Sequence, residues 1–490
     1  MTDEGYQLLV HGDQRQYLLD AGQGAIPQES LWVYRFYDQA ATTFVPPPHQ
    51  NLAEKLFRHL HQEVTADGFD IQAAAAGLYD LIVLIRAKTG APKVNLVAHS
   101  MGGLVARCMM QKICYQPDSK GQGREPPREL VARFFTYGTP HGGIAFQLGA
   151  LDWVEQAFGP AGSDIFAPPK MYGYLTPGAT FGDLPPDGTK WDPQELPDDV
   201  FPVDDVFCVI GTDPKDYGVS RVAVGPKSDG LVMIEHAYVR GAHRAFVYRS
   251  HSGAYGEVNS EEGYQNLRRF LFGRWGVRVD LDGLPQPPGP DDQPWPVWQA
   301  DLRLTIRGLP IVLTEQLAEH WCPIQLNDEI QQIGDAPDHP VPLVSTFLED
   351  PRPAPAQSEP DPQPPREGRM RYTLTLRVFK LDQQNGTFRF ANHLEQVPDW
   401  ADSLIVDVGP RAGGAGLAAW AAWNSAVHGA NDQFDPITDG LPEGQRDPLA
   451  LSRAGAAYVG QIPLPPGARA LPVLGPNAAL TIRVGDRASG

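Results

Sequence analysis

One serine has local surroundings that could make its hydroxyl a nucleophile. The stretch 93–103 reads KVNLVAHSMGG, in which an apolar run of strand length ends just before Ser100 and a helical pattern follows it. Ala98 and Gly102 flank the serine at two residues' distance, and such small side chains let a strand and a helix approach closely at a tight turn. That turn would expose the hydroxyl at the carboxyl edge of a sheet, beside a helix N-terminus that favours developing negative charge. We predict that Ser100 attacks acyl groups; the alternative is a serine that only caps the helix.

A second motif follows the next strand-like segment, where residues 137–143 read YGTPHGG. The AHSMGG turn resembles the nucleophile elbow of the small Bacillus lipases, which also have alanine at the first position of the G-x-S-x-G pattern. The second motif resembles the GTPHGG segment of bacterial lipases and of inositol-deacylating lipase-like enzymes. Residues 6–273 thus look like an α/β-hydrolase of the bacterial lipase/esterase type. The resemblance implies ester hydrolysis by a Ser-Asp-His triad.

The general base and its orienting acid must follow the nucleophile in the order serine, acid, histidine. His251 comes directly after a strand-like segment, where the resembled family holds its imidazole, and we prefer it to His243. The segment SDGLV resembles the one that carries the family's aspartate. We therefore prefer its Asp229 to Asp213, although Asp213 is better placed relative to its own strand.

Three further histidines are given other roles. His99 adjoins the nucleophile at a strand end, and because successive side chains of a strand point to opposite faces, its ring is expected to point away from the hydroxyl. His141 is interpreted as structural, and His236 lies in a segment that we expect to be helical.

The oxyanion formed during acyl transfer needs two preset backbone N–H donors. The residue after the nucleophile, Met101, supplies one. By the resemblance, the other lies after the first strand in a loop that begins His11-Gly12, which makes Asp13 the expected donor and Gln14 the alternative. The Asp13 carboxylate would have to turn outward, because negative charges repel each other.

The elements that must position these groups follow from the hydrophobic pattern of residues 1–280. Short apolar segments alternate with helical patterns, which favours a mostly parallel, doubly wound sheet covered on both faces. The predicted strands are 6–10, 31–37, 94–98, 134–137, 206–210 and 246–248. The predicted helices include 51–63, 71–88, 103–115 and 261–272. We predict an α/β-hydrolase catalytic domain over this range.

Residues 144–205 interrupt the alternation, because they are rich in proline, glycine and aromatic residues and show no sustained period. A long irregular insertion in a compact domain is usually functional or disordered. This one falls where hydrolases carry caps. We predict that it forms a lid and the acyl pocket.

The C-terminal part of the chain has a different pattern. Residues 281–298 are rich in proline and aspartate and are predicted to be a linker. Residues 299–490 contain spaced, alternating segments without helical partners, which predict a second, all-β, sandwich-like domain. Within it, the proline-dense stretch 350–367 is predicted to be a loop. We expect its clustered aromatic residues, Trp420 and Trp423 among them, to fill a core.

Composition narrows the possible partners. The chain has 490 residues, 42% of them hydrophobic and 20% charged, which is typical of a soluble globular protein. Its formal net charge of −19 argues against binding to nucleic acid and against electrostatic docking on anionic membranes, but not against transient burial of an apolar patch in a lipid surface. Neither CxxC nor HExxH spacing occurs, so we expect no metal and no cofactor.

The N-terminal segment is acidic, and no stretch approaches the roughly 20 apolar residues that span a bilayer. We therefore expect a cytoplasmic location, with export by a route that lacks a cleaved signal left open.

Together these observations predict a serine carboxylic ester hydrolase that acts on a small-molecule or lipid ester. Three alternatives stay open. An acyltransferase would pass the acyl group to an alcohol. An effector-like phospholipase would use the C-terminal domain to reach a membrane or a partner. A binding protein on an inactive hydrolase scaffold would be expected to have lost members of the triad.

Overall fold

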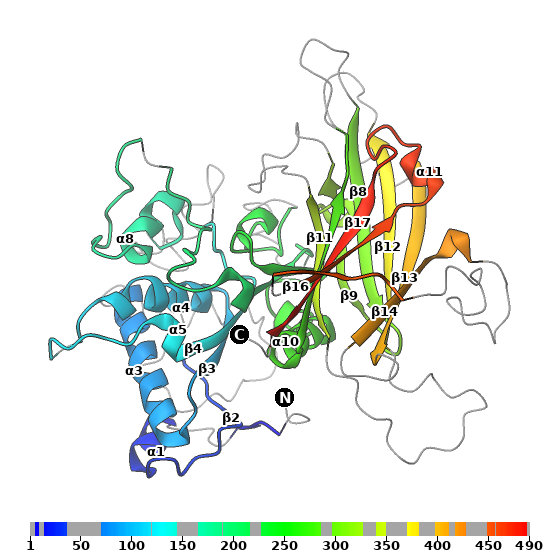
Figure 1. Ribbon diagram of the computed structural model, residues 1–490. Coiled ribbons are helices and arrows are strands. Elements are labelled where there is room, and N and C mark those ends of the chain that lie inside the picture. Colours follow the sequence, from blue (N-terminus) through cyan, green and yellow to red (C-terminus); the bar gives the residue numbers. More distant parts are fainter. Residues whose placement is uncertain are drawn as a thin grey trace. The chain divides into compact units, whose positions relative to one another are not determined.

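A computed structural model gives the fold in two compact units. It describes residues 5–8, 14–36, 70–118, 120–144, 165–188, 190–215, 227–285, 296–326, 340–348, 370–381, 397–410, 417–427, 448–455 and 457–487. The first unit comprises Met1–Arg244 and Arg249–Ser260, and the second comprises Ala245–Tyr248 and Glu261–Gly490. Parallel strands with helices make up the first unit and antiparallel sheets dominate the second (Figure 1). The predicted fold class is confirmed.

The main sheet of the first unit has the strand order β3-β4-β5-β6 in the described residues. Its strands are β3 (Val94–His99), β4 (Val131–Tyr137), β5 (Val206–Gly211) and β6 (His243–Val247). The ladders β3–β4 and β4–β5 are parallel. Every residue of β5 is buried, as expected for a strand covered on both faces.

Two short N-terminal strands lie where the sequence predicts strands 6–10 and 31–37. In the described residues they are β1 (Gln7–Leu8) and β2 (Ser30–Leu31), and residues 9, 10 and 37 lie outside the described residues. They pair in parallel with each other as a separate two-stranded sheet. Among the described residues, neither strand is hydrogen-bonded to the main sheet, so the prediction that they continue it is corrected here.

Helices flank the main sheet. The α-helices of the first unit are α1 (Gln14–Asp20), α3 (Ile71–Thr89), α4 (Met101–Gln111), α5 (Pro127–Leu130) and α8 (Tyr172–Leu175). Its short 3₁₀ helices are η2 (Ile113–Tyr115), η3 (Pro168–Met171), η4 (Val203–Asp205), η5 (Ile234–His236) and η6 (Glu257–Asn259). Predicted helix 71–88 agrees with α3, which begins at the capping side chain of Asp70 and ends at Gly90 with φ 71°. Predicted helix 51–63 lies outside the described residues.

Helix α4 is the central helix of this unit. Its residues from Gly103 to Gln111 are all buried, so it has no solvent-facing stripe along that length. The buried set includes Arg107, whose side chain is fully inaccessible. Lys112, directly after the helix, is 1% exposed. Buried cations need hydrogen-bond acceptors, and these two find them in the predicted lid.

Arg107 and Lys112 hold described parts of the insertion in place. The Arg107 guanidinium donates to the carbonyl oxygens of Pro193 at 2.6 Å and Glu195 at 2.7 Å. Lys112 Nζ donates to the carbonyl oxygens of Gly173 at 2.5 Å and of Ala179 at 2.6 Å. These bonds tie described parts of residues 165–205 to Arg107 and Lys112. The lid stays a prediction, and its residues 145–164 lie outside the described residues.

Replacing Arg107 with methionine is expected to lower the free energy of unfolding of the first unit by about 3 kcal/mol. Burial lowers the Arg107 pKa to about 10, so the guanidinium stays charged at neutral pH. Its removal leaves several buried carbonyl oxygens without their hydrogen-bond donor. Urea denaturation measures the change. The matched control is Arg128→Met, because Arg128 is exposed on α5. Equal stability of the two variants would contradict this prediction.

The second unit contains two antiparallel sheets. One has the order β10-β8-β12-β13-β14 with β9 paired to β8, and the other has the order β11-β7-β17-β16-β15. The strands of the first sheet are β8 (Val297–Ile306), β9 (Val312–Gln316), β10 (Ile324–Gln325), β12 (Met370–Leu381), β13 (Trp400–Pro410) and β14 (Leu417–Trp423). The strands of the second sheet are β7 (Trp275–Asp282), β11 (Val341–Leu348), β15 (Ser452–Ala454), β16 (Ala457–Pro463) and β17 (Ala479–Asp486).

Both sheets contribute to one hydrophobic core, which makes the second unit a sandwich. Leu302 and Leu376 come from the first sheet, and Leu281 and Leu480 from the second. Buried and half-buried residues alternate along β12, as its sequence predicts. Trp423, expected in a core, is buried in the same cluster. The helices of this unit are α10 (Glu261–Phe272), η7 (Ala318–His320), η10 (Asn424–Ala426) and α11 (Pro466–Arg469).

The second unit begins earlier in the chain than the predicted boundary at residue 280. Helix α10 belongs to it, because the buried Phe270 packs edge-on against Phe347 of β11 at 5.2 Å between ring centroids. Strand β7 also starts before that boundary and pairs with β11 and β17. The predicted linker 281–298 therefore connects β7 with β8 inside the sandwich, and its residues 286–295 lie outside the described residues, as does the predicted loop 350–367.

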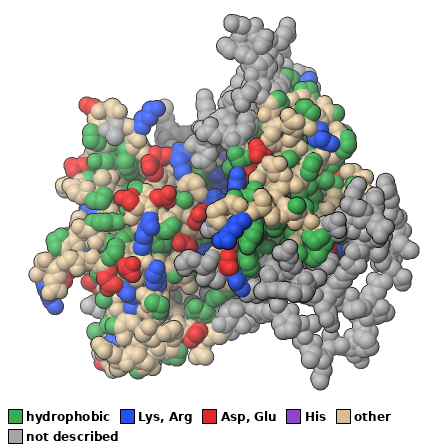
Figure 2. Space-filling model, viewed as in Figure 1, with side chains coloured by type: hydrophobic (Ala, Val, Ile, Leu, Met, Phe, Trp, Pro, Cys, Tyr) green, Lys and Arg blue, Asp and Glu red, His purple; other side chains and the backbone are tan. Residues whose placement is uncertain are grey.

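The distribution of charged side chains on the surface and the hydrophobicity of the helices relate to the expected partners and to membrane insertion. On the face shown in Figure 2, acidic and basic side chains of the described residues are interspersed among hydrophobic ones. Within the described part of the chain, no helix is both long enough and apolar enough to cross a membrane.

Candidate active site

Ser100 stands at a strained turn between β3 and α4. Its backbone has φ 55° and ψ −131°, which side chains other than glycine rarely adopt. The Ser100 N–H donates to the Tyr137 carbonyl oxygen at 2.9 Å, and the Thr139 hydroxyl donates to the Ser100 carbonyl oxygen at 2.9 Å. These two bonds from the end of β4 hold the turn in its strained conformation.

Small residues are required where α4 passes the second motif. A Cβ atom at Gly103 would lie 2.2 Å from Thr139 Oγ1 and 2.4 Å from its Cγ2, so only glycine fits there. A Cβ at Gly102 would approach the Ala98 Cβ at 3.9 Å. The AHSMGG and GTPHGG motifs therefore pack directly against each other, through Gly103 and Thr139.

His251 links Ser100 to Asp229. Its Nε2 lies 2.9 Å from Ser100 Oγ, and its Nδ1 lies 2.8 Å from Asp229 Oδ2. Because an ionised carboxylate only accepts, Nδ1 carries the proton, and Nε2 is left to accept from the hydroxyl. Both His251 and Asp229 are only 1% exposed. The structure thus brings the three sequence-predicted residues into one hydrogen-bonded chain.

The Asp229 carboxylate is held by a tight turn of its own. Its Oδ1 accepts from the backbone N–H groups of Leu231 at 2.9 Å and Val232 at 2.7 Å. The His251 N–H donates to the Asp229 carbonyl oxygen at 2.9 Å. With the His251 ring, three donors face the carboxylate, so its position relative to the imidazole is fixed from both sides.

His99 packs beside His251. The two ring centroids lie 4.7 Å apart, and His99 Nε2 donates to the His251 carbonyl oxygen at 2.8 Å. Burial first, and then the charge of His251, lower the His99 pKa to about 3, so this ring is neutral at physiological pH. Its position beside the base could not be read from the alternation of side chains along β3.

The oxyanion donors are described only in part. Met101 is the first residue of α4, where a helix offers its N–H no acceptor within the helix. Asp13, with His11 and Gly12, lies outside the described residues. Gln14, the alternative donor, begins α1, and its side-chain Oε1 accepts from the Val33 N–H at 2.9 Å.

Residues 48–158 match the family model described as "Putative serine esterase (DUF676)". This part of the chain is similar to serine esterases. The matched stretch contains Ser100 and the GTPHGG motif, and it ends before Asp229 and His251. A search of proteins with curated descriptions gave no match to this chain.

The other candidate residues from the sequence are not part of the Ser100–His251–Asp229 chain. Asp213 Oδ1 accepts from the Lys215 N–H at 3.1 Å, in a turn after β5. The His243 ring stacks on Phe207, with the centroids 6.4 Å apart. His141 Nε2 lies 3.2 Å from Thr136 Oγ1, and burial holds its pKa well below the usual range, which fits a structural role. His236 lies in the short helix η5, and its Nδ1 is 3.0 Å from the Gly143 carbonyl oxygen.

Sequence reasoning missed Glu257, a second carboxyl group at this site. Glu257 is fully buried in η6, close behind His251 and Asp229. Its only sequence signal was its position six residues after His251, and an isolated glutamate in a polar loop does not predict burial.

One group of side chains among the described residues has the spacing of metal ligands. It consists of His99, His251 and Glu257, whose donor atoms lie within 4.8 Å of one another. Both ring nitrogens of His251 are already engaged by Ser100 and Asp229, so the group does not offer three free ligands. We assign no metal to it.

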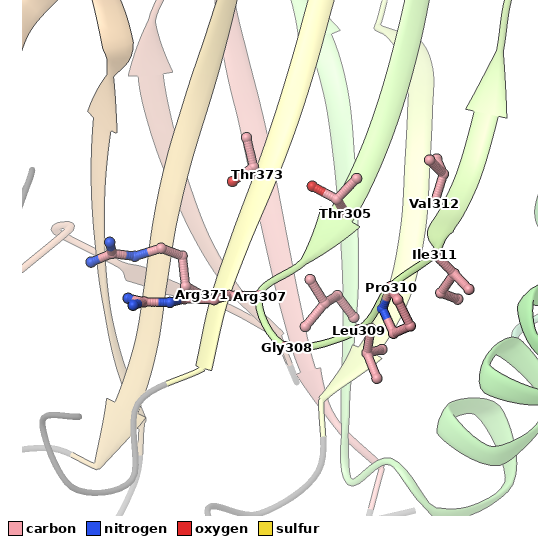
Figure 3. A pocket seen from close by; sticks show the side chains of 10 residues that line it. Thr305, Arg307, Gly308, Leu309, Pro310, Ile311, Val312, Arg371 and Thr373 are labelled. Carbon is pink, nitrogen blue, oxygen red and sulfur yellow. The ribbon is translucent and has the colours of Figure 1, made fainter. Parts of the chain in front are cut away.

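A separate hollow of about 550 Å³ is found in the second unit. It is lined by residues 305–312 together with Arg371 and Thr373. Figure 3 shows Arg307 and Arg371 at one end and the apolar turn Leu309–Val312 at the other. Arg371 is paired with Asp407 through two bonds of 2.7 Å, so its charge is already compensated. The hollow contains none of the triad residues.

Proposed function

We propose that the first unit is a serine-dependent carboxylic ester hydrolase in which Ser100 is the nucleophile, His251 the general base and Asp229 the orienting acid. One observation carries the proposal: the unbroken chain from Ser100 Oγ through the imidazole to the buried carboxylate, with links of 2.9 and 2.8 Å. The match of residues 48–158 to a serine esterase family supports the same reaction class.

In the first step, the Ser100 hydroxyl attacks the ester carbonyl carbon while His251 Nε2 takes its proton. The Asp229 carboxylate then stabilises the positive imidazolium through its bond to Nδ1. The imidazolium returns the proton to the leaving alcohol, and an acyl group remains on Ser100. Burial of the Asp229–His251 pair strengthens this electrostatic support, since little water screens it.

In the second step, water attacks the acyl-enzyme, with His251 again as the base. The negative charge on the carbonyl oxygen would be stabilised by the Met101 N–H at the positive end of α4. The second donor that we propose is the N–H of Asp13. The substrate class is a carboxylic ester of a small molecule or a lipid, with transient contact to a lipid surface in the latter case.

A fluorophosphonate probe tests the proposal, because it phosphonylates only a serine that a neighbouring base activates. We expect stoichiometric labelling of the wild-type chain on the peptide that contains Ser100, and none in Ser100→Ala. Ser30→Ala is the matched control in the same unit and should label as the wild type does. A folded wild-type chain that stays unlabelled, or equal labelling of Ser100→Ala, would contradict the proposal.

A further inference from the structure

Glu257 is a buried carboxyl group that the proposed mechanism does not use. Its side chain is fully inaccessible, and no side chain of the described residues hydrogen-bonds its carboxyl oxygens; the donor near them is the backbone N–H of Gly211. Its backbone is firmly held, because its N–H donates to the Ser250 carbonyl oxygen at 2.9 Å and the Ser260 hydroxyl donates to its carbonyl oxygen at 2.7 Å. The fold thus holds a carboxyl group without a side-chain partner in the interior, which costs free energy.

The Glu257 carboxyl shares one small space with the Asp229–His251 pair. A Cβ atom at Gly138 would lie 2.1 Å from Glu257 Oε1, 2.8 Å from His251 Nδ1 and 3.0 Å from Asp229 Oδ2. A carboxyl oxygen of Glu257 also lies within 4.8 Å of a ring nitrogen of His251. Because position 138 is glycine, no side chain at that position separates the glutamate from the imidazole.

The two neighbouring carboxyl groups, Asp229 and Glu257, differ in how many hydrogen bonds they accept. Asp229 accepts three hydrogen bonds, two from backbone N–H groups and one from the His251 ring. Burial first, and then the charge of Asp229, raise the Glu257 pKa well above its usual range, with a partial offset from the Gly211 N–H. The other titratable groups close to Glu257 are His251, His99 and Tyr137. The raised pKa favours the protonated, neutral form of Glu257 while the charge of Asp229 is present.

We propose that Glu257 is a positioning residue held in reserve: when the Asp229 carboxylate is removed, Glu257 loses its proton to solvent and orients His251 in its place. This inference rests on the proposed function, in which His251 is the base. Two features support it. Loss of the Asp229 charge removes one cause of the raised pKa, and the distance to the ring is short enough for a side-chain rotation to close.

The test compares variants in an Asp229→Asn background. We expect Asp229→Asn to lose about 10²-fold in kcat/KM for a p-nitrophenyl ester, instead of the roughly 10⁴-fold loss seen when a triad acid has no substitute. Adding Glu257→Gln should lower kcat/KM by about a further 10²-fold. Adding Asp213→Asn is the matched control and should change nothing, because that carboxylate is engaged at Lys215. Equal rates with and without Glu257→Gln would overturn the inference.

The pH profile gives a readout that a purely structural role would not move. In Asp229→Asn, both Glu257 and His251 must lose a proton for activity, so the acid limb of log kcat/KM against pH should be steeper than in Asp229→Asn/Glu257→Gln. Limbs of equal slope would count against the reserve role. If the double variant does not fold, Glu257→Asp in the same background shortens the reach by one methylene group and provides the same comparison.

Ser100→Ala separates this inference from the proposed function. Residual activity of Asp229→Asn that survives Ser100→Ala would mean that the proposed function itself has failed. Activity that depends on Ser100 but not on Glu257 overturns the reserve role alone. Stability adds an independent measurement: a raised folded-state pKa means that stability falls as pH rises above the ordinary glutamate range, so Glu257→Gln should raise the Tm more at pH 8 than at pH 5.

Discussion

Ser100→Ala is expected to lose ester hydrolysis almost completely, with kcat/KM for a p-nitrophenyl ester falling by about 10⁴- to 10⁶-fold. The reason is that no acyl-enzyme can form without the hydroxyl that lies 2.9 Å from His251 Nε2. Steady-state rates on short-chain p-nitrophenyl esters measure the loss. A rate within tenfold of the wild type would contradict the assignment of the nucleophile.

The control for this experiment uses the strained backbone of Ser100. Glycine tolerates a positive φ without steric cost, so Ser100→Gly should be at least as stable as the wild type in urea denaturation, and just as inactive as Ser100→Ala. An inactive variant of undiminished stability separates loss of chemistry from loss of fold. A less stable Ser100→Gly would mean that the turn depends on the serine side chain.

Gly138→Ala is expected to lower kcat/KM by about 10²-fold or more, because misplacement of catalytic groups by about 1 Å has effects of that size. Its new Cβ would collide with Glu257 Oε1 and crowd both atoms of the His251–Asp229 hydrogen bond. The backbone adds to the effect, since Gly138 has φ 47°. The same steady-state assay measures the loss, and circular dichroism shows whether the fold is kept.

Gly123→Ala is the matched control for this substitution. Nothing lies within 4 Å of a Cβ at Gly123, so the variant should keep the wild-type rate. A folded Gly138→Ala with wild-type kcat/KM would show that the Asp229–His251 geometry does not limit the reaction.

Some elements could be predicted from the sequence because their causes are local. Helix α3 agrees with prediction, since an aspartate cap, a helical apolar pattern and a terminal glycine are all visible within about 20 consecutive residues. The turn at Ser100 was equally accessible, because its steric requirement for small neighbours appears within a few positions. The GTPHGG motif could likewise be recognised within a few consecutive positions. The contact between Gly103 and Thr139 explains why the two motifs occur together.

Other features depended on contacts between distant segments. The pattern of α10 predicted a helix correctly, but not that Phe270 would pack on Phe347, 77 positions later, and so join the sandwich. The lid over residues 144–205 stays a prediction, but the pattern of that insertion did not indicate that the buried cation Arg107 would bond to Pro193 and Glu195 within it. The hydrophobic periodicity of a sequence carries no information about hydrogen bonds between segments that lie far apart in the chain.

The sequence by itself determined which groups could carry the chemistry that we propose: a serine at a tight turn, with an aspartate and a histidine following in the order that acyl transfer needs. Only the tertiary structure decided which further groups surround them, including the neutral ring of His99 and the buried carboxyl group of Glu257. The physical reason is that a side chain's type is written at one position, but its burial, charge state and partners depend on every segment folded against it.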